Sequence, residues 1–213
     1  MNDILVFSGM PASGKDTITD RLIELDSSFK RLKKYRTIES TDSIKDNYYN
    51  ISYTRFKKMI NENAFLQYHK RYGRYYGIAK STLLECLTEN SMPIIHIGRI
   101  ENYYVFLNGL KEIEKEYSIS INVVHVQLWA EKGELIDRIK KRDIVTGEIN
   151  MRIRAMEQEF SEAKELMKKK IKPFSVIIKN IDIEKTCSLI LNYMNKKDID
   201  DGYEEYRGYL MQI

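Results

Sequence analysis

The stretch GMPASGK, residues 9–15, carries two glycines and a lysine at the spacing of a phosphate-binding loop. Glycines let the backbone curl so that several N–H groups point toward one anion. The lysine adds a mobile positive charge, and a helix that begins at the loop adds its positive end. The pattern therefore predicts a nucleotide-binding loop. The residues expected to contact ATP are Gly9, Ala12, Ser13, Gly14, Lys15, Asp16 and Thr17.

The residue after the lysine is Asp16, where the motif usually has a serine or threonine whose hydroxyl holds magnesium. A carboxylate can also hold this ion, directly or through water, because magnesium prefers oxygen ligands and keeps several waters. Thr17 offers a hydroxyl one position further on. We therefore expect Asp16 or Thr17 to hold Mg²⁺, with ATP as co-substrate. The competing interpretation is a loop that has lost its chemistry.

The segments around the loop have the patterns that such a site needs. The run DILVFS, residues 3–8, is apolar like a buried parallel strand, and apolar positions at helical spacing follow Gly14. Alternating strand and helix patterns continue along the chain and predict an α/β fold with a parallel sheet. The further strand candidates are 92–98, 121–129 and 174–180, and the helix candidates are 101–116, 131–142, 149–170 and 182–195.

Three segments depart from this alternation. Residues 34–78 hold eight of the fifteen tyrosines, with short polar strand-like pieces and a helix at about 53–62, which predicts a small insertion built from hairpins. Residues 140–154 are charged, contain a glycine and form a second candidate insertion. The tail from Asp198 is acidic and then aromatic, and we expect a docked or frayed terminal segment.

The composition excludes several classes of protein. Of the 213 residues, 43% are hydrophobic, which is enough for a core, and the net charge of +4 is too small a surplus to predict nucleic-acid binding. The sequence contains no run of 18 apolar residues, so no membrane span is expected. The first residues lack the features of a signal peptide. We expect a cytoplasmic protein that contacts neither nucleic acid nor membrane.

The histidines and cysteines lack the spacing of a zinc site, and none is predicted. His96 in IIHIG and His125 in VVHVQ lie within strand candidates, where we expect packed core side chains. Cys86 and Cys187 lie far apart in helix-like contexts, and we expect reduced, buried thiols.

Beyond the loop, the segment from Tyr35 to residue 97 resembles the acceptor-binding part of the guanylate kinase family. The matching pieces keep the family's order, and they are Arg36, Asp42, YYNI from Tyr48, RFKKMI, AFLQY and RYYGIAKSTL. With the loop and the later segment RIKKR…EINMRI, the resemblance covers residues 4 to about 195.

The resemblance implies a P-loop NTPase fold with a five-stranded parallel sheet flanked by helices, in a single guanylate kinase-like domain. It implies ATP-dependent phosphoryl transfer to a phosphorylated small molecule, in a monomer or homodimer. The implied parts are a core of 1–33, 91–130 and 156–195, an acceptor-binding lobe of 34–90, a lid of 131–155 and a C-terminal tail of 196–213.

The resemblance also implies roles for individual residues. An arginine can grip two phosphate oxygens and a tyrosine adds a neutral donor, which suits Arg36, Tyr48 and Tyr76 to the acceptor phosphate. No side-chain nucleophile is expected, because charge neutralisation and in-line positioning carry such transfers. The implied catalytic residues are Lys15 and the lid arginines Arg138, Arg142 and Arg152. The other implied acceptor contacts are Asp42, Gln67, Gly98 and Arg99.

Three departures from the family pattern concern the acceptor. An expected arginine falls on Glu39, the guanine-reading glutamate on Gln67, and an acidic strand end on Gly98. A carboxylate offers guanine two acceptors and an amide only one, so the base preferred by this chain stays open. The first hypothesis is a nucleoside monophosphate kinase for GMP or a related nucleotide. The alternatives are a phosphosugar kinase of the ribose 1,5-bisphosphate type, which shares Gly-Lys-Asp, and a non-catalytic binding module.

Overall fold

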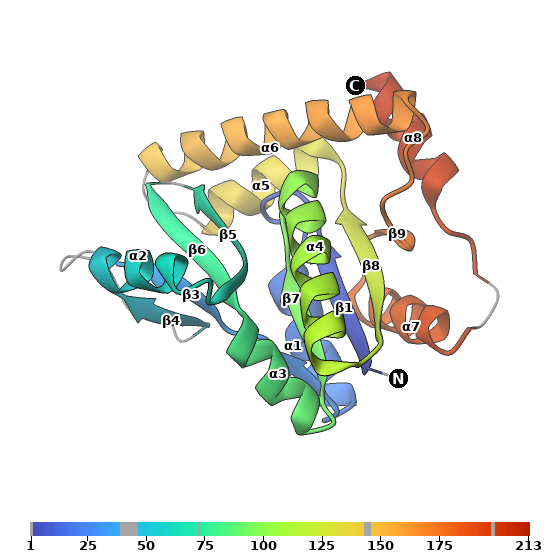
Figure 1. Ribbon diagram of the computed structural model, residues 1–213. Helices are drawn as coiled ribbons and strands as arrows, with labels where there is room; N and C mark the ends of the chain where they lie inside the picture. The colour runs from blue at the N-terminus through green and yellow to red at the C-terminus, as the bar shows by residue number, and fades with distance from the viewer. Residues whose placement is uncertain (1, 39–46, 72, 143–145, 197–198) are drawn as a thin grey trace. The chain divides into compact units, whose positions relative to one another are not determined.

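The computed structural model describes residues 2–38, 47–71, 73–142, 146–196 and 199–213, without the side chains of residues 142, 146 and 148 (Figure 1). The strands are β1 (Asn2–Ser8), β2 (Phe29–Arg31), β3 (Lys34–Thr37), β4 (Tyr48–Ile51), β5 (Phe65–Arg71), β6 (Arg74–Ala79), β7 (Met92–His96), β8 (Ile121–Trp129) and β9 (Val176–Lys179). The helices are α1 (Lys15–Leu25), α2 (Tyr53–Asn61), α3 (Lys80–Thr88), α4 (Ile100–Tyr117), α5 (Lys132–Arg142), α6 (Thr146–Lys168), α7 (Ile183–Met194) and α8 (Tyr203–Gln212).

The chain packs as two compact units, each assembled from separated stretches of sequence. The first unit comprises Met1–Ile4, Ser27–Ile95 and Ile100–Asn122, and the second comprises Leu5–Asp26, His96–Arg99 and Val123–Ile213. The phosphate-loop sequence belongs to the second unit and the tyrosine-rich segment to the first. The boundaries of core, lobe and lid given above stay predictions.

A five-stranded, all-parallel sheet has the order β2-β7-β1-β8-β9, which confirms the predicted fold class. At one edge β2 pairs with β7 through Phe29 and Met92, and at the other β8 pairs with β9 through Val126 and Val176. The strand predicted at 121–129 matches β8 residue for residue. The edge strand β2 was missed, because its three residues FKR carry no apolar run.

The first unit also holds a four-stranded sheet of order β4-β3-β6-β5. One face of this sheet packs against α2 through a small core of Phe56, Met59, Phe65 and Ala79. The strands β5 and β6 form the antiparallel hairpin expected from the sequence. The hairpin prediction is wrong for β3 and β4, which pair in parallel, with Lys34 opposite Tyr48 and Thr37 opposite Ile51.

In the second unit, α1 packs on α7, and α6 packs on both α5 and α8. Within the candidate insertion at 140–154, residues up to Arg142 belong to α5 and residues from Thr146 belong to α6, and its role as an insertion stays a prediction. The tail is docked: Tyr203, Tyr206 and Leu210 of α8 are buried. Both cysteines are free and buried, as expected. Among the helices of the described residues, none combines the length and apolar character needed to cross a bilayer.

His125 is buried in the second unit, next to Ser8 at the end of β1. Its Nε2 lies 2.7 Å from Ser8 Oγ, and its Nδ1 lies 3.0 Å from the carbonyl oxygen of Pro173. The Ser8 hydroxyl also donates to the carbonyl oxygen of Ile97 at 2.6 Å. Burial lowers the pKa of His125 from 6.5 to about 3, so the ring is neutral in the folded protein. The prediction of a core histidine is confirmed at this position.

The pKa of His125 predicts an acid-sensitive fold. Between pH 6.5 and about 3 the unfolded chain binds a proton that the folded protein excludes, so this group lowers the free energy of unfolding as pH falls. The expected slope is about 1.4 kcal/mol per pH unit below 6.5. Chemical denaturation at pH 7.5, 6.5 and 5.5 measures it, with His125→Gln as the reference that lacks the group. Equal slopes in both proteins would contradict the assignment.

Candidate functional site

The loop at residues 9–15 has the backbone conformation of an anion cradle. Gly9 and Gly14 have φ angles of 145° and 94°, and Ala12 has a φ of 64°. A Cβ atom at position 14 would collide with the amide of Asn180, so only glycine fits there. Gly14 precedes the first turn of α1, and its carbonyl accepts from Ile18 N at 2.9 Å. The loop thus ends at a helix N-terminus, where N–H groups and the helix dipole favour anions.

Lys15 holds its positive charge inside this loop. Its Nζ donates to the carbonyl oxygens of Gly9 and Met10 at 2.7 and 2.9 Å, and to Ser13 Oγ at 3.1 Å. These acceptors keep the ammonium group close to the backbone amides, where an incoming phosphate would bind.

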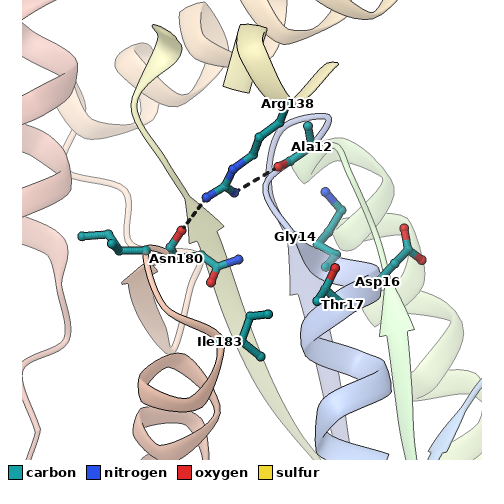
Figure 2. Close-up of a pocket in the computed structure, with 9 residues that line it drawn as sticks. Ala12, Gly14, Asp16, Thr17, Arg138, Asn180 and Ile183 are labelled. Atoms are coloured by element: carbon teal, nitrogen blue, oxygen red, sulfur yellow. Dashed lines mark hydrogen bonds between the residues drawn. The ribbon is translucent and has the colours of Figure 1, made fainter. Parts of the chain in front are cut away.

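A pocket of about 360 Å³ opens on the loop (Figure 2). Its walls come from the loop, the first turn of α1, α5 and the segment from the end of β9 to α7. The lining residues are Ala12, Gly14, Lys15, Asp16, Thr17, Arg138, Asn180, Ile181 and Ile183. Ile181 and Ile183 are exposed apolar side chains at one wall, so the pocket joins a polar, cationic end to an apolar surface.

Arg138 of α5 closes one side of the pocket. Its guanidinium donates to the carbonyl oxygen of Ala12 at 3.3 Å and to that of Asn180 at 3.0 Å (Figure 2). It also forms an ion pair with Glu134 one turn earlier in the helix. The expected lid arginine therefore already contacts the phosphate loop.

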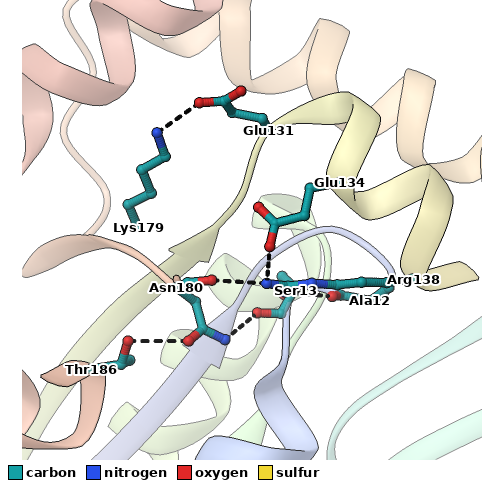
Figure 3. Close-up of polar contacts among 8 residues, drawn as sticks. All are labelled: Ala12, Ser13, Glu131, Glu134, Arg138, Lys179, Asn180 and Thr186. Carbon is teal, nitrogen blue, oxygen red and sulfur yellow. Dashed lines mark hydrogen bonds and ion pairs between the residues drawn. The ribbon is translucent and has the colours of Figure 1, made fainter. Parts of the chain in front are cut away.

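Asn180 connects the parts of the pocket (Figure 3). It is 5% exposed, its Nδ2 donates to the Ser13 carbonyl at 2.8 Å, and its Oδ1 accepts from Thr186 at 3.1 Å. Its backbone N–H donates to the carbonyl oxygen of Trp129 at 2.8 Å. No sequence motif predicted a role for Asn180. Its place just after a parallel strand, where α/β proteins gather their site residues, was the available signal.

Asp16, the unusual loop residue, has a partner on β7. Its Oδ1 lies 3.7 Å from His96 Nδ1, and His96 Nε2 lies 2.7 Å from Thr19 Oγ1. The Asp16 side chain is 53% exposed, while that of His96 is 18% exposed. The expectation of a packed core histidine is wrong for His96, because the strand ends at this residue and its ring reaches the first turns of α1.

The residues present fit a magnesium ion. Asp16 and Thr17 both line the pocket and are exposed, and carboxylate and hydroxyl oxygens are ligands that Mg²⁺ prefers. Asp16 Oδ1 faces a histidine that can orient it, as outer partners orient metal-binding carboxylates.

The other lid arginines are less well defined. Arg142 is the last residue of α5, and its side chain lies outside the described residues. Arg152 lies on α6 and is absent from the described lining of the pocket. Their catalytic roles stay predictions.

In the first unit, the expected acceptor residues share one face of the four-stranded sheet. Asn50, Arg36, Tyr76 and His69 are paired in register across β4, β3, β6 and β5. Directly paired residues point to the same side of a sheet, and it is the side opposite the α2 core. We call this row and its neighbours Tyr48 and Gln67 the acceptor face.

The acceptor face is internally ordered. Arg36 is 5% exposed, donates to Asn50 Oδ1 at 3.0 Å and lies 5.2 Å from the centre of the Tyr48 ring. The rings of Tyr48 and Tyr76 meet edge to face with their centres 5.7 Å apart, and the Tyr76 ring stacks on that of His69 with the centres 5.6 Å apart. A cation and two hydroxyl-bearing rings thus lie together, which is a chemistry suited to a phosphate.

Gln67 lies two residues before His69 on β5, the edge strand of the sheet, and belongs to the same face. It is 3% exposed, and its Nε2 lies 3.0 Å from His69 Nδ1. His69 therefore has an amide on one side and the Tyr76 ring on the other. The sequence singled out Gln67 but gave no role to His69, whose signal was its alternation with Gln67 on a strand.

The remaining expected acceptor residues do not belong to the described part of this face. Asp42 lies outside the described residues. Gly98 and Arg99 follow β7 in the second unit, and Arg99 forms an ion pair with Glu162 of α6.

The sequence comparisons agree on one family. A family model described as "Guanylate kinase" matches residues 1–197. The chain is 30% identical over 141 residues to a guanylate kinase of Caldanaerobacter subterraneus subsp. tengcongensis, covering 65% of this chain and 64% of that protein. It is 31% identical over 117 residues to the guanylate kinase of Clostridioides difficile, covering 53% and 52%. The matches thus span less than two thirds of these relatives' lengths.

Longer but weaker similarity extends over nearly the whole chain. A guanylate kinase of Prochlorococcus marinus subsp. pastoris is 24% identical over 196 residues, which is 90% of this chain and 96% of that protein. The crystal structure of guanylate kinase from Anaplasma phagocytophilum superposes with a TM-score of 0.62 at 18% identity, covering 96% of this chain and 93% of that one. This structural likeness shows the same fold.

The Asn180 contacts predict a strong effect of a nearly isosteric change. Asn180→Asp keeps an acceptor for Thr186 but places a carboxylate oxygen where an amide donates to the Ser13 carbonyl. We expect a loss of about 1–3 kcal/mol in the free energy of unfolding and roughly tenfold weaker MgATP binding. Chemical denaturation and titration calorimetry measure the two effects. The matched control is Asn195→Asp, at the exposed end of α7. Wild-type affinity in the Asn180 variant would contradict its role in the loop.

Proposed function

Because the chain belongs to the guanylate kinase family, we propose that it transfers the terminal phosphoryl group of ATP to the phosphate of a nucleoside monophosphate. The observation that carries the proposal is the pocket of the second unit. There, a loop with glycines at the strained positions 9 and 14, the Lys15 ammonium and the Arg138 guanidinium surround about 360 Å³.

On the ATP side, the loop amides and Lys15 bind the outer phosphates, and Arg138 neutralises the charge that spreads over the γ-phosphoryl oxygens during transfer. An oxygen of the acceptor phosphate forms a bond to the γ-phosphorus while the bond from that phosphorus to the β–γ bridging oxygen breaks. The electron pair of the broken bond leaves with ADP. No side chain forms a covalent bond.

Asp16 and Thr17 hold Mg²⁺ in this proposal, and His96 orients the Asp16 carboxylate at 3.7 Å. When bound, the ion supplies positive charge shared by the β- and γ-phosphates. The Thr19 hydroxyl, 2.7 Å from the other nitrogen of His96, keeps the ring from turning away from the loop. Asp16 is thus compatible with a working site.

On the acceptor side, Arg36, Tyr48 and Tyr76 hold the phosphate of the monophosphate. The ordered contacts among them support this role, because a phosphate then binds without first fixing three flexible side chains. Gln67 is the proposed base-reading residue. Its amide presents a single acceptor where a carboxylate would present two, and its Nε2 lies close to His69, so Gln67 itself gives the 2-amino group of guanine no second acceptor. We propose a purine monophosphate, with GMP and its analogue lacking the 2-amino group accepted to similar degrees.

Lys15→Ala tests the reaction. Loss of one charge that stabilises the transferring phosphoryl group predicts a fall in kcat/KM of about 100-fold or more. ADP release is measured with ATP, magnesium and a panel of nucleoside monophosphates plus ribose 1,5-bisphosphate. Lys115→Ala, on the exposed side of α4, is the matched control and should keep wild-type turnover. Turnover with the phosphosugar alone would replace the proposed acceptor, and absence of turnover with every acceptor would favour a binding module.

Gln67→Glu tests the reading of the base. A carboxylate offers both oxygens to the N1–H and N2–H₂ groups of guanine, and a hydrogen bond to a charged acceptor is worth about 1.5–3 kcal/mol. We expect the ratio of kcat/KM for GMP over IMP to rise about tenfold or more. Gln212→Glu, at the exposed end of α8, provides the control. An unchanged ratio would remove Gln67 from base recognition.

A further inference from the structure

The C-terminal helix lies outside the match to the family model, which ends at residue 197. The helix α8 begins at Tyr203 and packs against α6 and β9 (Figure 1). Its approach is fixed by backbone contacts at the edge of the sheet. Ile177 N of β9 donates to the Asp201 carbonyl at 2.8 Å, and Gly202 has a φ of 72°, where a Cβ atom would collide with the Ile177 carbonyl.

The first turn of α8 is held in place by Tyr203. Its hydroxyl accepts from Phe174 N at 2.8 Å and donates to the carbonyl of the same residue at 2.9 Å. These bonds satisfy both backbone polar groups of a residue just before β9. The tail is therefore docked with a defined register and does not rest on a general apolar contact.

Tyr206, one turn further on, reaches the phosphate-binding loop. It is fully buried, its hydroxyl lies 4.0 Å from Met10 Sδ, and its ring lies 5.2 Å from that of Trp129. Burial raises the pKa of Tyr206, so the hydroxyl stays protonated and able to donate. Met10 and Gly9 are the loop residues whose carbonyls accept from Lys15.

Tyr209, at the next position on the same side of α8, reaches the start of α5. Its hydroxyl accepts from Lys132 N at 2.6 Å, and its ring lies 5.0 Å from Trp129 and 6.3 Å from Phe160 of α6. Lys132 is the first residue of α5, and the first N–H groups of a helix have no partner within the helix. A side chain from a distant part of the sequence therefore caps the helix that carries Arg138.

We propose that α8 is a positioning element for the phosphoryl-transfer site, in which Tyr209 fixes the start of α5 and thereby holds Arg138 against the loop. Tyr206 supports the same loop from the side of Met10. Arg138 lies six residues after Lys132, within two helical turns, so a loosened first turn displaces its guanidinium from the Ala12 and Asn180 carbonyls. The role of Arg138 in this inference rests on the proposed function.

Tyr209→Phe tests the inference, because it keeps the ring against Trp129 and removes only the hydroxyl. We expect kcat to fall about fivefold, as for one lost neutral hydrogen bond, while KM for the acceptor stays unchanged. In an Arg138→Ala background the same change should have no further effect on kcat, because residues that act through one another are not additive. Tyr117→Phe, at a 48% exposed tyrosine of α4, is the matched control.

A second measurement does not depend on turnover. Hydrogen exchange of the amides at the start of α5 should be several-fold faster in Tyr209→Phe than in the wild type, with the amides of α1 unchanged. Unchanged exchange and unchanged kcat would overturn the inference. So would an equal fall in kcat in both backgrounds, since the effect would then bypass Arg138. If the wild type turns over no acceptor, the proposed function fails, and the exchange rates with MgATP affinity decide the role of α8 alone.

Discussion

The close approach of the Asn180 amide to the backbone of Ser13 and Gly14 is the constraint on which the second unit depends. A Cβ atom at position 14 would meet this amide, the φ of 94° there also favours glycine, and the bond from Asn180 to the Ser13 carbonyl ties the loop to the end of β9. The same residue bonds α7 through Thr186 and Arg138 through its own carbonyl. The loop, the end of β9 and two helices therefore meet at one buried amide. Loss of one of these contacts would leave a buried amide unpaired, which is costly, so we expect the contacts of Asn180 to form and break together.

The unusual aspartate of the loop makes sense when it is considered together with the residue that faces it. The acid is on the loop, where a hydroxyl is usual, and the ring of His96 faces it from the strand end opposite. A neutral or cationic ring beside a carboxylate avoids the repulsion that two acids would create at this distance. Thr19 then fixes the other side of the ring. Asp16 on the loop and His96 at the strand end thus complement one another. Asp16 considered without His96 would suggest a loop that has lost its function.

The sequence predicted the elements with strong apolar patterns and the residues that belong to a recognised motif. The strand at 121–129 and the loop glycines are examples, because a buried parallel strand and a left-handed turn each leave a local signature. Asn180, His69 and Tyr209 were missed because their roles come from contacts with residues far along the chain. The parallel pairing of β3 with β4 was missed for the same reason, whereas the edge strand β2 was missed because its three residues carry no apolar run. The acceptor face was predicted only through the family resemblance, since a row of residues across four strands has no spacing in the sequence.

The division of the chain into two units has a consequence for how the protein is made and inherited. Each unit draws on separated stretches, and three of the five boundaries fall inside β1, β7 and β8. Neither unit corresponds to a contiguous gene segment, so neither is easily exchanged by recombination or expressed as a single fragment. Many native contacts also join residues distant in sequence, so loops must close before these contacts form, which is characteristic of slow folding. We therefore expect the two units to fold together, once the whole chain is available.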